Sequence, residues 1–150
     1  MTDAERWMRR ALALAAARGA DAEPNPAVGC VLVKDGQLLA EAATAPGGRP
    51  HAEEQALAAT AAPMGATAYV TLEPCGARSS GAPSCAERLV TAGIARVVVG
   101  CRDPHPLASG RGLARLVAAG VPVTLGVLED EAQALVNAWL TRHAGGGQRG

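Results

Sequence analysis

Short apolar runs alternate with helix-forming segments along this chain, and this alternation restricts the possible folds more than any other feature. Helices are expected at 2–18, 51–62, 85–92, 109–119 and 129–143, and Thr2 and Glu5 are expected to form a capping box at the first of them. Strands are expected at 27–33, 37–43, 67–72, 95–100 and 121–126. The first two strands flank Lys34-Asp35-Gly36, a hairpin turn, and the other strands follow helices. This order predicts an α/β fold, a three-layer α/β/α sandwich with a mixed five-stranded sheet.

The length of the chain fits one domain with a single core. It has 150 residues, of which 49% are hydrophobic and 19% are charged. We expect the domain to cover residues 1–143 and a flexible tail to cover 144–150. No apolar run is long enough to span a bilayer, and no export signal is evident, so the expected compartment is the cytoplasm.

The charge balance disfavours a nucleic-acid partner. Fourteen basic residues match fourteen acidic residues, whereas nucleic-acid binders usually carry a basic face. Proteins that bind single strands also use aromatic platforms, and this chain has no Phe, two Trp and one Tyr. The partner is therefore expected to be a small molecule, with neither nucleic acid nor membrane involved.

Three short pieces of sequence carry the residue types of a metal site. They are His51-Ala52-Glu53, Pro74-Cys75 and Cys85, each at or near the point where a loop meets a predicted helix. A catalytic zinc ion takes three protein ligands from imidazole and thiolate groups, and it keeps a fourth position for water. His51, Cys75 and Cys85 supply one such set, for one Zn²⁺ per chain. Glu53 lies two residues from His51 and can move protons as a general acid and base.

The spacing leaves a second interpretation open. The pieces are similar to the H-x-E and P-C-x-x-C signature of zinc nucleobase deaminases, but nine residues separate Cys75 from Cys85 where the signature has two. The two cysteines could instead form a closed structural site or be buried thiols. Cys30 and Cys101 lie on or at the ends of apolar strands, and we interpret them as small core residues.

Asn25 lies between two prolines just before the first predicted strand. The Pro24-Asn25-Pro26 segment could be only a rigid turn. Its amide also offers a donor and an acceptor, which suit the edge of a heterocyclic ring. Both interpretations remain open on spacing alone.

With these residues in view, the chain resembles the deaminase domain of the bacterial bifunctional riboflavin-pathway enzyme, diaminohydroxyphosphoribosylaminopyrimidine deaminase. The resemblance covers about residues 5–142. It rests on Pro-Asn-Pro-Ala-Val-Gly-Cys-Val at 24–31, Pro-His-Ala-Glu at 50–53, Ala-Thr-Ala-Tyr-Val-Thr-Leu-Glu-Pro-Cys at 66–75, Ala-Gly-Ile-Ala-Arg-Val-Val-Val at 92–99, Asp-Pro-His-Pro at 103–106 and Gly-Val-Leu-Glu at 126–129.

The resemblance implies a cytidine-deaminase-like fold with zinc at His51, Cys75 and Cys85 and with Glu53 as the proton shuttle. It also implies that Asn25 lies in the substrate pocket. We expect Asn25 and backbone groups around Ala52 and Glu73 to hold the ring of an aminopyrimidine, from which ammonia is released. Related folds complete their pockets across subunits, so a homo-oligomer is expected. The family usually carries a reductase domain, which leads us to expect that a separate reductase works beside this chain.

The substrate side departs from the family. Thr44 stands where the family has a His seven residues before the zinc His, and Ala77 stands where the first loop His would be. The family's loop Lys or Arg, a phosphate contact, is missing, and Arg78 is the nearby cation that could replace it. His105 replaces the Asn of Asp-Pro-Asn-Pro. Losing one charge-assisted contact costs about 1.5–3 kcal/mol, enough to change the preferred substrate.

Three alternatives follow. A deaminase of the same fold could act on another small heterocycle, such as cytosine, cytidine or a guanine-like ring. A deaminase that edits tRNA or DNA fits less well, because the charge balance and the scarcity of aromatic residues argue against it. A zinc-stabilised binding module without turnover is the alternative outside enzymes, and it would not need Glu53.

Overall fold

The computed structural model describes residues 1–78 and 80–143. Helices alternate with strands as the sequence predicted, and the five strands form one mixed sheet in the order β2-β1-β3-β4-β5. The elements are α1 (Asp3–Arg18), η1 (Gly19–Ala22), β1 (Gly29–Lys34), β2 (Gln37–Ala43), α2 (Ala52–Ala58), β3 (Thr67–Leu72), α3 (Cys85–Thr91), β4 (Arg96–Cys101), α4 (Arg111–Ala118), β5 (Val123–Leu125) and α5 (Glu129–Arg142).

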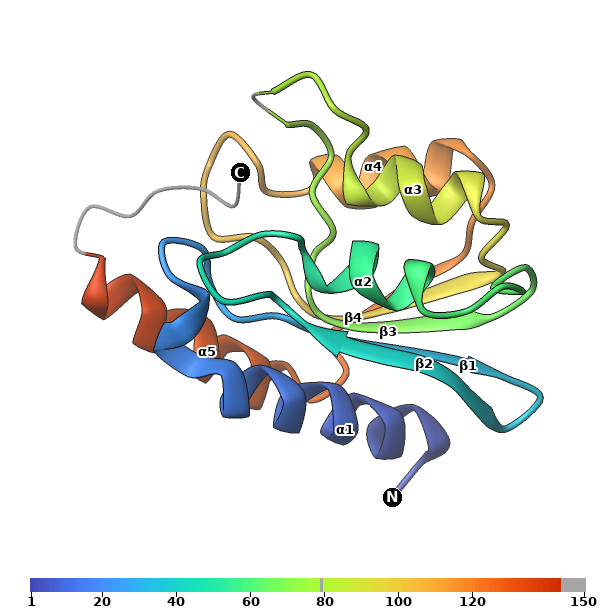
Figure 1. The fold of residues 1–150 in the computed structure, drawn as a ribbon, viewed down its shortest axis with the longest axis horizontal. Helices are drawn as coiled ribbons and strands as arrows, with labels where there is room; N and C mark the ends of the chain where they lie inside the picture. The colour runs from blue at the N-terminus through green and yellow to red at the C-terminus, as the bar shows by residue number, and fades with distance from the viewer. Residues whose placement is uncertain (79, 144–150) are drawn as a thin grey trace.

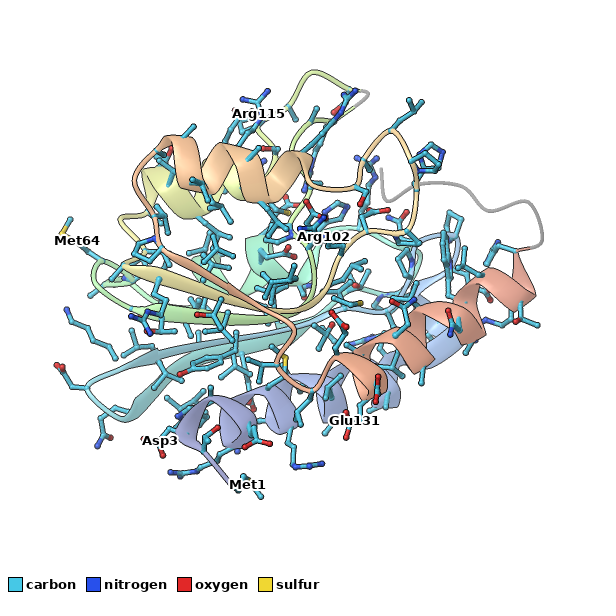
Figure 2. The ribbon with its side chains drawn as sticks, turned by 180° about the vertical axis from the view of Figure 1, so that it is seen from behind. Met1, Asp3, Met64, Arg102, Arg115 and Glu131 are labelled. Carbon is cyan, nitrogen blue, oxygen red and sulfur yellow. The ribbon has the colours of Figure 1, made fainter. Side chains whose placement is uncertain are left out.

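The sheet lies between two helix layers, which confirms the expected α/β/α sandwich. Figure 1 shows α1 and α5 below the sheet and α2, α3 and α4 above it. The reverse view in Figure 2 shows the same layers, with Arg115 in the upper one and Asp3 and Glu131 in the lower one. No helix in the described part of the chain is both long and apolar enough to cross a membrane.

Strand direction brings the ends of β3 and β4 to one edge of the sheet. β1 pairs antiparallel with β2 and with β3, whereas β3, β4 and β5 run parallel. β1, β3 and β4 are buried over nearly their whole length, as strands covered on both faces are. The segments that follow β3 and β4 therefore leave the sheet together (Figure 1), and carboxyl ends of parallel strands are the usual place for a binding site.

Local sequence explains where several elements begin. Thr2 caps α1 and forms a capping box with Glu5, as the sequence predicted. The hairpin between β1 and β2 turns at Asp35 and Gly36, whose positive φ angles of 51° and 73° match the twist of paired strands.

Several boundaries differ from the sequence prediction; β1, for example, begins at Gly29 instead of residue 27. α2 ends at Ala58, because the Thr60 hydroxyl accepts a hydrogen bond from Ala62 N–H and forms a turn instead of continuing the helix. α4 begins at Arg111, since Gly110 before it has the left-handed φ of 81°. β5 is shorter than expected, and the single turn of η1 was not expected. The predicted tail at 144–150 lies outside the described residues.

Candidate metal and substrate site

His51 is the N-cap residue of α2, and its side chain is completely buried. Its backbone N–H donates to Glu54 Oε1 at 3.1 Å, and this hydrogen bond helps to fix where the helix begins. The local sequence thus holds the imidazole at the first turn of α2.

Cys75 and Cys85 are joined by backbone hydrogen bonds although nine residues separate them in the sequence. Cys75 follows β3, and Cys85 is the first residue of α3, which Ser84 caps. Cys85 N–H donates to Cys75 Sγ at 3.1 Å, and Ala86 N–H donates to the Cys75 carbonyl oxygen at 3.1 Å. The N-terminus of α3 is therefore attached to Cys75, and its partial positive charge favours negatively charged sulfur.

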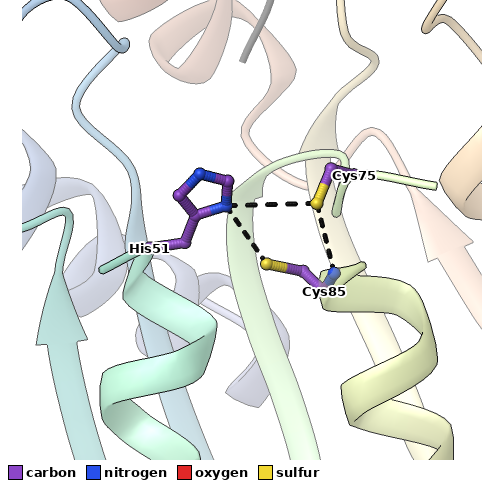
Figure 3. A group of neighbouring side chains, drawn as sticks. All are labelled: His51, Cys75 and Cys85. Atoms are coloured by element: carbon purple, nitrogen blue, oxygen red, sulfur yellow. Dashed lines mark hydrogen bonds between the residues drawn. The ribbon is translucent and has the colours of Figure 1, made fainter. Parts of the chain in front are cut away.

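The three side chains converge on one point, as Figure 3 shows. His51 Nδ1 lies 3.3 Å from Cys85 Sγ and 4.0 Å from Cys75 Sγ. All the ligand atoms of the group lie within 4.8 Å of one another. Within residues 1–78 and 80–143, this is the one group of three or more His, Cys, Asp or Glu side chains with metal-binding geometry. Cys30 and Cys101 lie elsewhere.

One imidazole and two thiols form a donor set that fits zinc. The position of Arg78 in the structure tests whether this donor set attracts a cation. Arg78 Nη2 lies 3.0 Å from His51 Nδ1 and 3.4 Å from Cys85 Sγ. A positive group is therefore placed against the same nitrogen and sulfur atoms that would bind the metal. These donors point their lone pairs at a cation, and we conclude that the residues fit a zinc ion.

Arg78 is held in this place by Glu54. The two side chains form an ion pair, and only 5% of the Arg78 side chain and 17% of the Glu54 side chain are exposed. Burial raises the pKa of the Glu54 carboxyl, but the hydrogen bonds from Arg78 and from the His51 backbone, together with the charges of Arg78 and Arg88, outweigh burial and bring the pKa below its ordinary value. Burial lowers the pKa of the Arg78 guanidinium, while Glu54 and the Cys85 sulfur raise it more strongly. Both groups are thus charged.

Glu53 and Ala52 lie in the first turn of the helix that His51 caps, and both are completely buried. A buried carboxyl group is costly unless other groups satisfy it, and it is uncommon without a specific role. The structure therefore places Glu53 on the same helical turn as His51.

Asn25 and Thr44 join the loops that precede β1 and α2. Asn25 Nδ2 donates to the Gly48 carbonyl oxygen at 2.7 Å. The Thr44 hydroxyl accepts from Val28 N–H at 2.9 Å and donates to the Pro26 carbonyl oxygen at 3.3 Å. Both side chains are nearly or completely buried. In this structure the two side chains hold the segment that leads into His51, through contacts at Thr44 and Gly48.

His105 lies in the segment between β4 and α4. Its backbone N–H donates to Asp103 Oδ1 at 2.9 Å, and its Nδ1 accepts from Leu107 N–H at 3.2 Å. These bonds form a local turn. His105 is partly exposed, and its Nδ1 atom is used within the loop to which it belongs.

Cys30 and Cys101 are core residues, which confirms the sequence interpretation. Cys30 is 0% exposed and Cys101 is 1% exposed, and both belong to the hydrophobic cluster on the sheet. Burial, followed by the nearby carboxylates of Glu129, Asp103 and Glu73, raises the pKa of the Cys101 thiol to about 12. These two thiols are therefore separate from the metal-binding pair.

Sequence reasoning missed Glu54 and the side chain of Glu73. Glu54 stands three residues after the helix cap His51, which is the capping-box position, so its sequence position offered a signal. Glu73 is 1% exposed, and its carboxylate accepts three backbone N–H groups from a distant segment. No sequence spacing indicates such contacts.

Residues 1–101 match the model of a protein family described as the cytidine and deoxycytidylate deaminase zinc-binding region. Among curated proteins, the chain is 47% identical over 139 residues to the riboflavin biosynthesis protein RibD of Escherichia coli, covering 92% of this chain and 38% of that protein. It is 40% identical to the chloroplastic riboflavin biosynthesis protein PYRD of Zea mays, over 93% of this chain and 36% of that protein. The chain thus spans well under half the length of these relatives.

Solved structures give the same result. The chain superposes on Acinetobacter baumannii RibD with a TM-score of 0.85 and 47% identity, covering 92% of this chain and 39% of that one. It superposes on a deaminase/reductase of Thermotoga maritima with a TM-score of 0.84 and 38% identity, covering 93% and 42% respectively. The Rib2 deaminase of Aspergillus oryzae, at 24% identity and a TM-score of 0.70, supports the fold.

Proposed function

We propose that this chain removes the amino group of an aminopyrimidine by hydrolysis, because it belongs to the family of cytidine and deoxycytidylate deaminases that share a zinc-binding region. Zinc-dependent deamination is the chemistry of this family. The observation that carries the proposal is the cluster of His51, Cys75 and Cys85 at the N-termini of α2 and α3. The buried Glu53 on the turn that follows His51 supplies an acid and base group.

We assign metal binding to His51, Cys75 and Cys85. When bound there, zinc acidifies a water molecule and so supplies a nucleophile at neutral pH. The α3 N-terminus stabilises negative charge on the two sulfur atoms. Glu53 would accept a proton from the attacking water and deliver it to the ring nitrogen. It would then accept the second proton, from the hydroxyl group added to the ring carbon, and pass it to the amine, which leaves as ammonia. Burial of Glu53 keeps bulk water from competing for that proton.

The substrate we propose is the diaminohydroxyphosphoribosylaminopyrimidine of riboflavin biosynthesis. The support is the identity of 47% to RibD of E. coli, and the name of the Thermotoga relative, a diaminohydroxyphosphoribosylaminopyrimidine deaminase. The matched stretch covers 92% of this chain, so it spans the loops around the site as well as the proposed zinc ligands.

The contacts to substrate are also proposals. Asn25 and the backbone at Ala52 would hold the ring, while Arg78 and His105 would contact the ribose phosphate. Arg78 Nε is a buried donor without an acceptor among the described residues, so a substrate oxygen could pair with it while Nη2 stays on Glu54. Thr44 would act indirectly, since its hydroxyl is used by Val28 and Pro26.

A second candidate is a deaminase of the same fold that acts on an unphosphorylated heterocycle, such as cytosine, cytidine or guanine. The observation that favours it is the pairing of Arg78 with Glu54, because a guanidinium bound to a carboxylate attracts a phosphate less strongly. The loop that carries Arg78 also lacks the family's own Lys or Arg.

The deciding experiment measures zinc content and ammonia release for the wild type, Glu53→Gln and Glu87→Gln. The substrate is the riboflavin-pathway pyrimidine phosphate, with cytosine, cytidine and guanine as alternatives. We expect about one zinc per chain in all three proteins and a fall in kcat of at least about 100-fold for Glu53→Gln. Glu87, which is exposed on α3, is the matched control for loss of a carboxylate.

Each outcome decides a different point. Ammonia release from the unphosphorylated rings alone would reject the proposed phosphorylated substrate but support deaminase activity. Unchanged turnover in Glu53→Gln would contradict the proposed role of Glu53 in proton transfer. Zinc binding without ammonia from any substrate of the panel would favour a zinc-stabilised binding module.

We also propose two partners, a second copy of this chain and a reductase. The Thermotoga relative is named for a deaminase and a uracil reductase activity, and this chain matches 42% of it. The reductase step is therefore assigned to residues outside the matched part. Light scattering on the zinc-loaded protein tests self-association, and a monomer at micromolar concentration would contradict it.

A further inference from the structure

Glu73 is a buried carboxylate immediately before Pro74 and Cys75. Its side chain is 1% exposed, and its backbone N–H donates to the Cys101 carbonyl oxygen at 2.9 Å, so it continues the pairing of β3 with β4. Burying a carboxylate is unfavourable unless hydrogen bonds compensate for the lost water. The mechanism above makes no use of this group.

Three backbone N–H groups from one segment satisfy the carboxylate. Asp103 and Gly110 donate to Oε1 at 3.0 Å each, and Leu113 donates to Oε2 at 3.2 Å. Gly110 is the N-cap of α4 and has no side chain to cap the helix. Glu73 therefore caps α4 from another element, where a negative charge is favoured.

The backbones of the two segments also lie in direct contact. A Cβ atom at Gly112 would meet the Pro74 carbonyl oxygen at 1.7 Å, and one at Gly76 would meet the Arg111 carbonyl carbon at 2.8 Å. The start of α4 is thus packed against the residues on both sides of Cys75. Figure 1 shows the two segments rising from the same edge of the sheet.

The loop between these anchors carries His105. Within the loop, His105 N–H bonds to Asp103 Oδ1, and Ala108 and Ser109 N–H both bond to the His105 carbonyl oxygen at 3.0 and 2.8 Å. These bonds give the loop its shape, but they do not attach it to the segment that carries Glu73 and Cys75. Glu73 makes that attachment at both ends of the loop, at Asp103 and at Gly110.

We propose that Glu73 is a positioning residue that fixes the 103–110 loop, and with it His105, beside the Cys75 end of the site, and thereby sets how tightly substrate binds. The part that concerns substrate rests on the proposed function. The part that concerns the loop does not.

The test compares Glu73→Gln with a control of equal stability. A Gln side chain has almost the same size, but its NH2 group would face N–H donors in place of an acceptor. The control is a substitution of Met8, which is 0% exposed in α1 on the opposite face of the sheet. Of Met8→Leu and Met8→Ala, the variant used is the one whose melting temperature is closer to that of Glu73→Gln. Both proteins are studied with zinc bound.

The first measurement is amide hydrogen exchange by NMR at Asp103, Gly110 and Leu113. We expect exchange at least about tenfold faster in Glu73→Gln than in the Met8 control, because local opening of this segment becomes easier. Equal exchange in the two variants would overturn the proposal, whether or not the protein has turnover.

The second measurement is steady-state ammonia release from the riboflavin-pathway pyrimidine phosphate. We expect KM to rise about tenfold in Glu73→Gln, with kcat within about threefold and zinc near one per chain, since only substrate binding depends on the loop. A fall in kcat at unchanged KM would also overturn the proposal. No ammonia from the wild type would reject the proposed substrate and leave the exchange result to decide about Glu73.

A milder variant keeps the test available if Glu73→Gln does not fold. Glu73→Asp retains the charge but shortens the reach, and we expect an intermediate change in exchange and in KM. Wild-type exchange rates in Glu73→Asp would contradict the proposed contacts.

Discussion

Glu54 links three parts of the site at the scale of a single residue. Its carboxylate accepts the His51 N–H, pairs with Arg78 and lies 3.7 Å from Arg88 Nη2. The first contact fixes the start of α2, and the other two bind the loop and α3 to it. One side chain thus connects both helices whose N-termini carry metal ligands.

A double-mutant cycle on Glu54 and Arg78 tests this connection. Glu54→Gln keeps an acceptor for His51 N–H but leaves a buried guanidinium unpaired, so we expect a loss of about 1.5–3 kcal/mol in the free energy of unfolding. Glu54→Gln/Arg78→Met should recover part of this loss, with a coupling energy above about 0.5 kcal/mol by urea unfolding of the zinc-loaded protein. Additive effects of the two changes would contradict the ion pair.

The four cysteines should separate into two pairs by reactivity. At pH 8 a thiol with a pKa of about 12 is thiolate in about one molecule in ten thousand, so iodoacetamide should leave Cys101 unmodified in the folded protein. Cys30, which is fully buried, should behave likewise. After zinc is removed by a chelator, Cys75, which is 8% exposed, should react first, and its modification should open the site and expose Cys85 beside it. Peptide mass spectrometry measures the order, and early modification of Cys101 would contradict it.

Glycines allow α4 to pack directly on the backbone that follows β3, and β1 to pack directly on the backbone of α1. A Cβ atom at Gly112 in α4 would meet Pro74 O at 1.7 Å, and one at Gly29 in β1 would meet the Ala11 carbonyl oxygen of α1 at 1.9 Å. The first contact lies next to Cys75, whereas the second faces the opposite helix layer. The two glycines are therefore a matched pair for separating stability from the site.

We expect Gly112→Ala and Gly29→Ala both to lower the free energy of unfolding by about 1–3 kcal/mol, because each forces two backbones apart. Only Gly112→Ala should also weaken zinc binding, by about tenfold, since it displaces the residues around a ligand. Competition with a chromophoric chelator measures the affinity. Equal zinc affinities in the two variants would show that the packing of α4 does not affect the metal site.

At the scale of elements, the sequence predicted what local residues determine. The Thr2 cap and the Asp35-Gly36 turn depend on neighbours within a few positions, and both were found where predicted. The end of α2 was misplaced although the Thr60 turn beyond it is local. The start of α4 was misplaced because a carboxylate 37 residues away in the sequence accepts the Gly110 N–H and caps the helix. Tertiary contacts decide such boundaries.

At the scale of the whole molecule, the order of elements predicted the sandwich, whereas the residue types and the family resemblance predicted that His51, Cys75 and Cys85 lie together. Parallel strands and the helices between them bring these positions to one edge of the sheet. The placement of Arg78 could not be predicted, because its loop has no regular pattern and its position is set by Glu54 from α2. The roles of Asn25 and Thr44 as links between loops depend in the same way on the folded chain.

The extent of the folding unit gives a last prediction. The described core residues lie between Trp7 and Trp139, and α5 closes the unit through Trp139 Nε1, which donates to the Pro24 carbonyl oxygen at 3.1 Å. Truncation after residue 143 removes none of these contacts, so the melting temperature and the zinc content should stay unchanged. This result would support 1–143 as the domain.

Truncation after residue 138 is the matched comparison, because it removes Trp139, which is 3% exposed. The loss of a buried Trp costs about 3–5 kcal/mol, and it also releases Pro24, next to Asn25. We therefore expect a lower melting temperature together with a higher KM, while zinc, bound through α2, β3 and α3, stays near one per chain. If truncation after 143 destabilised the protein as much as truncation after 138, the folding unit would have to include residues beyond 143.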